Sequence, residues 1–188
     1  MKNRDVFKTF RQHIDPVASE LGFNAQSNTG TDLPWIRKLD NRRHEIVWIQ
    51  MDKWPWDAWM GSKFTVNFQN ARSPKIGLSR GTKLCRIGDL LKGNYKRDAE
   101  RIQNEAISKI KVPTGKQYKA EMGFESDEFI LDEYREQSQP VKFGKNLGDL
   151  WLRIVVPEDV TSWAIFLSDW LPKALSDFAK LDGDQYMW

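Results

Sequence analysis

The spacing of apolar residues changes along the chain, and this constrains the fold more than any other feature. At 3–21 apolar residues recur every three or four positions, which is typical of an amphipathic helix. Between 35 and 69 the pattern is that of β-strands, and at 95–111 and 157–181 the helical spacing returns. A helix followed by consecutive strands and then by further helices predicts an α+β fold.

The first helix should pack on a sheet through one apolar face. The apolar face consists of Phe7, Phe10, Ile14 and Val17. Pro16 predicts a kink, or a restart of the helix with Asp15 as its cap. The final helix contains Pro172, which predicts two helical pieces on one line.

The strands should form an antiparallel sheet of about four to six strands. Segments 35–39 and 45–51 flank a polar turn and predict a hairpin. Because 45–51 is apolar on both faces, we expect it to be central and covered on both sides. Segment 64–69 alternates, which indicates one buried and one solvent-facing polar face. Segment 84–87 should be another strand, with Cys85 buried.

The length of 188 residues predicts one α+β domain, 1–188. The single cysteine excludes a disulfide framework and a cysteine-built zinc site. No apolar run approaches the ~18 residues that span a bilayer, and the first ten residues lack the apolar core of a signal peptide. We therefore expect a cytoplasmic protein without membrane contact.

The net charge of +3 conceals two segments of opposite sign. Residues 72–120 contain 13 Lys and Arg against 4 Asp and Glu, whereas 121–140 contain one arginine against seven acids. The two segments either neutralise each other or face charged partners. The sequence favours neutralisation, either mutual or by solvent, because the pI of 8.9 is below the ~9 typical of nucleic-acid-binding domains.

No motif in the chain predicts catalysis. Residues 77–81 match the G-x-S-x-G pattern of hydrolases around Ser79, but both histidines, His13 and His44, precede it, and no buried strand leads into it. We interpret this segment as a loop. The two histidines lack metal-site spacing, and the acids of 121–136 indicate a solvated helix rather than a nuclease site. We expect no catalytic residue, no metal site and no cofactor.

The most unusual segment is 48–59, which contains four of the nine tryptophans. Trp54, Trp56 and Trp59 lie in a connection between two strands, where they either fold back on the sheet or project from it. We predict that one indole anchors the connection and that at least one other is exposed. Exposed indoles would serve a protein interface, or would stack on bases beside Arg80, Lys83 and Arg86.

Several short segments resemble one bacterial protein family, the domain of unknown function 4304. They are the helix end Leu21-Gly22-Phe23, the strand at 47–54, the run at 64–68 and the Arg-Ile-Gly-Asp-Leu-Leu run at 86–91. The similarity covers about residues 5–91, and relative to this family residues 92–148 look like a helical insertion or a divergent part. The resemblance implies a small α+β domain and brings no activity or catalytic residue with it.

Three functions are compatible with these features. The first is a non-catalytic protein-binding module of an immunity or defence type, based on the three tryptophans. The alternatives are a nucleic-acid-binding protein that uses the basic segment 72–119, and an enzyme of unrecognised type. The oligomeric state is left open.

Overall fold

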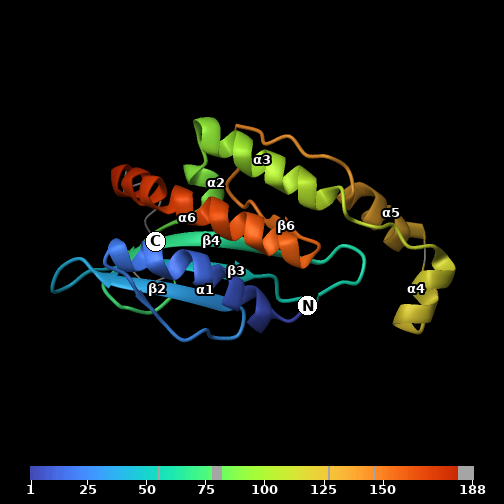
Figure 1. The fold of residues 1–188 in the computed structure, drawn as a ribbon, viewed down its shortest axis with the longest axis horizontal. Coiled ribbons are helices and arrows are strands. Elements are labelled where there is room, and N and C mark those ends of the chain that lie inside the picture. The colour runs from blue at the N-terminus through green and yellow to red at the C-terminus, as the bar shows by residue number, and fades with distance from the viewer. Residues whose placement is uncertain (55, 78–81, 127, 146, 182–188) are drawn as a thin grey trace.

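The architecture is a single antiparallel sheet with helices packed against it, as the apolar spacing predicts (Figure 1). The computed structural model describes residues 1–54, 56–77, 82–126, 128–145 and 147–181. Within these residues the strands are β1 (Asn24–Ala25), β2 (Asp32–Lys38), β3 (His44–Met51), β4 (Ser62–Ala71), β5 (Lys83–Arg86) and β6 (Leu152–Ile154). The helices are α1 (Asn3–Glu20), α2 (Ile87–Leu90), α3 (Gly93–Ile107), α4 (Gly115–Met122), α5 (Glu128–Gln137) and α6 (Pro157–Lys180).

The strands follow the order β1-β2-β3-β4-β5, and β6 also pairs with β4. The predicted hairpin is confirmed as β2 and β3, which pair Trp35 with Val47. One edge of β4 pairs with β3. Its other edge is shared by β6, which pairs at 62–64, and by β5, which pairs at 67–70. The strand β4 therefore connects distant parts of the chain.

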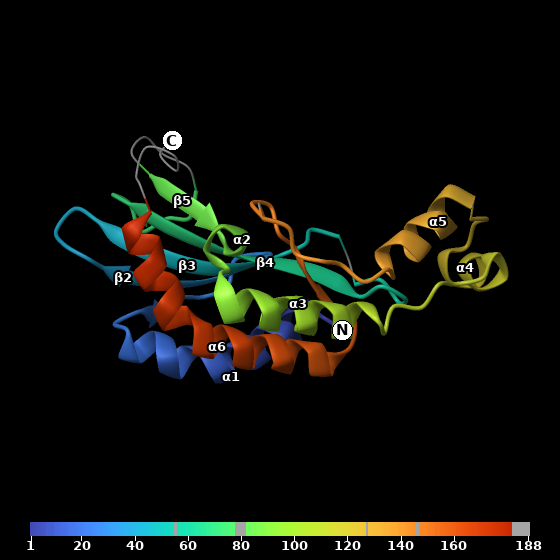
Figure 2. The same ribbon diagram turned by 90° about the horizontal axis from the view of Figure 1, so that it is seen from above.

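Helices α1 and α6 lie side by side over one face of the sheet (Figures 1 and 2). The buried face of α1 consists of Val6, Phe7, Phe10, Ile14 and Ala18. The prediction for Val17 was wrong, because Ala18, one turn after Ile14, occupies the buried position and Val17 is only half-buried.

Neither internal proline interrupts its helix. Pro16 lies within α1 and Pro172 within α6, and both helices continue through them. Instead of capping a new helix, Asp15 accepts a hydrogen bond of 2.7 Å from the indole of Trp35 in β2. The predicted restart at Asp15 was therefore wrong, and Asp15 ties α1 to the sheet.

The second face of the sheet is buried as well. Ile46 and Trp48 are buried there, which confirms that β3 is covered on both sides. Thr65, Asn67 and Gln69 of β4 are also buried, so the predicted solvent-facing side of this strand was wrong. The side-chain N–H of Gln69 donates a hydrogen bond of 3.0 Å to the carbonyl of Lys75, and its side-chain oxygen accepts one of 3.1 Å from the N–H of Gly77. The segment after β4 therefore folds back beneath this face.

The segment 92–148 contains three helices that relate differently to the core. Helix α3 packs on α6 and buries Ala99 and Ile102, whereas α4 and α5 lie beyond one end of the sheet (Figure 2). The sequence did not predict α4. Thr114 caps it by accepting a hydrogen bond of 3.3 Å from the N–H of Gln117. None of the helices in the described part of the chain is long and apolar enough to cross a membrane.

Candidate functional site

The connection between β3 and β4, residues 52–61, is here called the tryptophan loop. Asp57 organises it, because one carboxylate oxygen accepts hydrogen bonds of 2.7 Å from the N–H groups of both Trp59 and Met60. Backbone hydrogen bonds between Asp57 and Gly61, of 2.8 and 3.0 Å, close the turn. Gly61 adopts a φ of +70°, which favours glycine. Residues 57–61 of the loop therefore form a defined turn.

The three indoles of the loop have different surroundings. Trp54 is 69% exposed, Trp56 packs against the core, and Trp59 stacks on Tyr118 of α4 with ring centroids 5.9 Å apart. The ring of Tyr134 of α5 meets Trp59 edge-on at 5.8 Å. This confirms the predicted split between anchored and exposed indoles. Trp59 is an anchor for α4 and α5 as well as for the loop.

Two further polar contacts attach α5 to the body of the protein. The Tyr134 hydroxyl donates to the second carboxylate oxygen of Asp57 at 2.7 Å. Burial, reinforced by this bond to Asp57, raises the pKa of Tyr134 well above its ordinary value. Gln137, at the end of α5, accepts a hydrogen bond from the guanidinium of Arg153 in β6.

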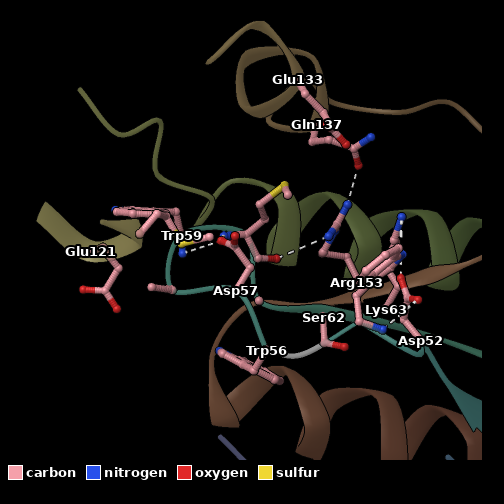
Figure 3. A pocket seen from close by; sticks show the side chains of 15 residues that line it. Asp52, Trp56, Asp57, Trp59, Ser62, Lys63, Glu121, Glu133, Gln137 and Arg153 are labelled. Carbon is pink, nitrogen blue, oxygen red and sulfur yellow. Dashed lines mark hydrogen bonds and ion pairs between the residues drawn. The ribbon is translucent and has the colours of Figure 1, made fainter. Parts of the chain in front are cut away.

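A pocket of about 600 Å³ lies between the tryptophan loop, α5 and β6 (Figure 3). Four carboxylates line it, those of Asp52, Asp57, Glu121 and Glu133. The lining also includes the three indoles of the loop, Met60, Met122 and the two cations Lys63 and Arg153. Aromatic and acidic groups thus converge on one cavity, which we call the acidic pocket.

Arg153 is the most deeply buried charge of the acidic pocket, with 5% of its surface exposed. Burial lowers its pKa, and the negative charges of Asp57, Asp52 and Glu133 oppose that shift. Its guanidinium donates to Gln137 and, at 3.4 Å, to the carbonyl of Met60. Among the described residues it forms no ion pair with a carboxylate.

Exposed apolar side chains surround the mouth of the acidic pocket. Trp54 stands on the loop side, and Met122, 45% exposed, lines the pocket from the end of α4. Phe129, 78% exposed, lies on α5 one turn before Glu133, outside the lining of the pocket. Such residues around an acidic cavity are typical of an interaction surface.

The basic residues predicted for binding lie elsewhere. Lys83 donates to the carbonyls of Phe178 and Leu181 at 2.7 and 2.9 Å, and Arg86 pairs with Asp149. Lys83 pairs with Asn70 of β4, and Arg86 pairs with Asn67. These positions lie about 27 and about 17 Å, respectively, along the strand from Ser62, where the loop ends. Arg80 lies outside the described residues, as does Ser79. Lys83 and Arg86 therefore do not share a surface with the tryptophans of the loop.

The acidic and basic segments form one ion pair with each other in the described part of the chain, Lys119 with Glu125. The guanidinium of Arg135 pairs instead with Glu128 and Asp132 of its own helix. Glu121 and Glu133 form no ion pair in the structure as described. Of the neutralisation that the sequence favoured, mutual or by solvent, one ion pair between the segments is present, and the acids of α5 face solvent.

Reasoning from the sequence missed Asp57, Glu133, Tyr134 and Arg153 as site residues. Asp57 carried a local signal, since an aspartate two residues before Trp59 is typical of a side-chain-capped turn. Arg153 was the lone charge in an apolar β-like run. Cys85, by contrast, is buried as predicted, and burial raises the pKa of its thiol, which excludes it as a nucleophile at neutral pH.

No group of three or more His, Cys, Asp or Glu within the described ranges is placed to hold a metal ion. Comparisons with protein-family models, with curated proteins and with solved structures found no match. The resemblance to the domain of unknown function 4304 therefore stays a prediction, and the function must be argued from the geometry of the site.

Proposed function

We propose that this chain is a non-catalytic protein-binding module that docks a basic segment of a partner protein on the acidic pocket. One observation carries the proposal: the exposed side chains of Trp54 and Met122 line an acid-rich cavity of about 600 Å³. Aromatic residues in such settings are typical hot spots of protein interfaces.

The charge of the pocket argues for a basic partner. Four carboxylates face two cations, and the surrounding segment 121–140 adds further negative charge, of which one residue, Glu125, pairs with the basic segment in the described chain. A lysine or arginine side chain entering the pocket would meet carboxylates and indole faces, and both attract a cation. An acidic partner would be repelled.

The same charge argues against the nucleic-acid alternative at this site. Stacking of bases on Trp54 would bring phosphates toward Asp52, Glu121 and Glu133. The cations that would hold those phosphates, Lys83 and Arg86, lie farther along β4 and have partners within the chain. Binding of a basic protein segment does not require these cations to lie beside the tryptophans.

The proposal is tested with two fluorescent peptides of equal length, one rich in lysine and leucine and the other rich in glutamate and leucine. We expect the lysine peptide alone to bind in fluorescence anisotropy. The variants Trp54→Ala and Glu133→Lys should each weaken its binding by about tenfold or more. The matched controls Ile165→Ala, an exposed apolar residue on α6, and Glu20→Lys, an exposed acid at the end of α1, should bind as the wild type does.

A fluorescent oligothymidylate provides the opposing arm of the experiment. If it binds more tightly than the lysine peptide and Trp54→Ala weakens that binding, the module is a nucleic-acid binder and the proposal fails. Equal binding of the lysine and glutamate peptides would also contradict it, because charge would then not select the partner.

A further inference from the structure

A second pocket, of about 440 Å³, adjoins the acidic pocket on the far side of Arg153. The two pockets share Lys63, Gln137 and Arg153 in their linings, so they adjoin at these side chains, and we call the two together the groove. The second pocket is mainly apolar; its apolar lining is Ile107, Val141, Phe143, Leu147, Leu150 and Trp151. We call it the apolar pocket.

The chemistry of the groove changes along its length. The acidic pocket has four carboxylates and the apolar pocket one, Glu136, beside Lys142 and three glutamines. Between the two pockets stand the two shared cations. Lys63 is 37% exposed at its side chain, and its ion pair with Asp52 measures 3.9 Å, which is too long for a hydrogen bond. Its ammonium therefore has hydrogens to donate to a ligand.

We infer that the groove receives a free carboxyl terminus, whose last residue is apolar and whose preceding residue is basic. This rests on the proposed function and specifies which segment of the partner binds. The terminal carboxylate would meet the ammonium of Lys63, next to the guanidinium of Arg153, at the junction of the pockets. The last side chain would enter the apolar pocket, and the basic residue would reach toward Glu133 and Asp52.

A chain terminus satisfies this order of groups better than an internal segment does. A terminal residue carries its carboxylate and its side chain on the same Cα, so one residue supplies both the anion for the junction and the apolar group for the adjoining pocket. An internal residue offers a neutral carbonyl there, and charge-assisted hydrogen bonds are roughly twice as strong as neutral ones. The buried position of Arg153 raises the electrostatic benefit of a nearby anion.

The experiment compares one fluorescent peptide ending in Lys-Leu as a free acid with the same peptide ending as the amide. We expect the acid to bind about tenfold more tightly, because only the acid places a charge beside Lys63. Replacing the terminal leucine by serine should weaken binding by a similar factor, since the apolar pocket would then be unfilled. Both measurements use the whole chain.

A thermodynamic cycle assigns the effect to the junction. In Lys63→Gln the free-acid peptide should lose most of its gain in affinity over the amide peptide, while the affinity of the amide peptide stays unchanged. The matched control Lys8→Gln on α1 should retain the full difference in affinity between the two peptides. Circular dichroism verifies that both variants are folded.

The outcomes separate the two ideas. If acid and amide bind equally, or Lys63→Gln leaves their ratio unchanged, the inference about the carboxyl terminus is overturned while the proposed docking of a basic segment stands. If neither peptide binds and longer internal lysine peptides do not bind either, both are overturned.

Discussion

Gly61 shows how a single residue sets the geometry of the tryptophan loop. Its φ of +70° is unfavourable for other residues, and a Cβ there would lie 1.9 Å from the carbonyl oxygen of Ile154. We predict that Gly61→Ala destabilises the protein by more than about 2 kcal/mol in urea denaturation, because strain and a backbone clash add together.

Gly30 provides the matched control for that substitution. Its φ of +58° is similar, but the space around it is open. Gly30→Ala should therefore cost only the conformational strain, about 1–2 kcal/mol. Equal losses in the two variants would show that β6 does not pack closely against the loop.

The hydrogen bond from Tyr134 to Asp57 gives a prediction that depends on pH. Because burial and Asp57 raise the pKa of Tyr134 in the folded state, the bond contributes its full stability below the ordinary tyrosine pKa of about 10 and loses it as the pH rises further. Tyr134→Phe should lower the free energy of unfolding at pH 7 by about 1.5 kcal/mol.

The check is the difference in unfolding free energy between wild type and Tyr134→Phe, measured from pH 7 to strongly alkaline pH. That difference should shrink above about pH 10. A difference that stays constant across this range would mean that folding does not raise the pKa of Tyr134.

At the scale of elements, α4 and α5 depend on one aromatic anchor. Trp59 contacts Tyr118 and Tyr134, which are the buried side chains of the two helices. We predict that Trp59→Ala increases hydrogen exchange in α4 and α5 by about tenfold or more and leaves β3 and β4 protected, because local openings need not involve the core. Trp56→Ala, which removes packing against the core, should instead accelerate exchange throughout the sheet.

Most elements could be predicted from the spacing of apolar residues. An element that buries one face repeats apolar residues at the period of a helix or of a strand. The helix α1 and the hairpin of β2 and β3 are of this kind. The helix α4 was missed because only Tyr118 is buried in it, so its sequence shows no helical repeat of apolar residues. The buried polar side of β4 was missed because Thr65, Asn67 and Gln69 look solvent-facing until the folded chain covers them.

The candidate site was predictable only in part. The tryptophans stand out locally, and the split between exposed Trp54 and anchored Trp59 followed from counting how many indoles one connection can bury. Glu133 and Arg153 come from segments far along the chain, and no local pattern places them beside the loop. Only the pairing of β6 with β4 brings Arg153 there.

At the scale of the whole molecule, charge is segregated rather than neutralised. A single ion pair, Lys119 with Glu125, joins the acidic segment to the basic one in the described chain. Raising NaCl from about 0.05 M to about 0.5 M should therefore leave the melting temperature nearly unchanged, since exposed pairs contribute little to stability.

The same change in salt should weaken binding of the lysine peptide strongly, because the attraction of the acidic pocket is screened. Differential scanning fluorimetry and anisotropy on one set of samples provide both values. Binding that resists salt would mean that apolar contact with Trp54 and Phe129 dominates over charge.

The pairing of β6 with β4 also has a consequence for the time at which the protein becomes competent to bind. Ser62 pairs with Ile154, so one wall of the groove is synthesised long after the tryptophan loop. A ribosome-bound chain that ends before β6 can form the hairpin of β2 and β3 while its acidic pocket still lacks Arg153. A partner that requires the complete groove would ignore unfinished and truncated chains, so recognition itself would act as a test that synthesis has passed residue 154.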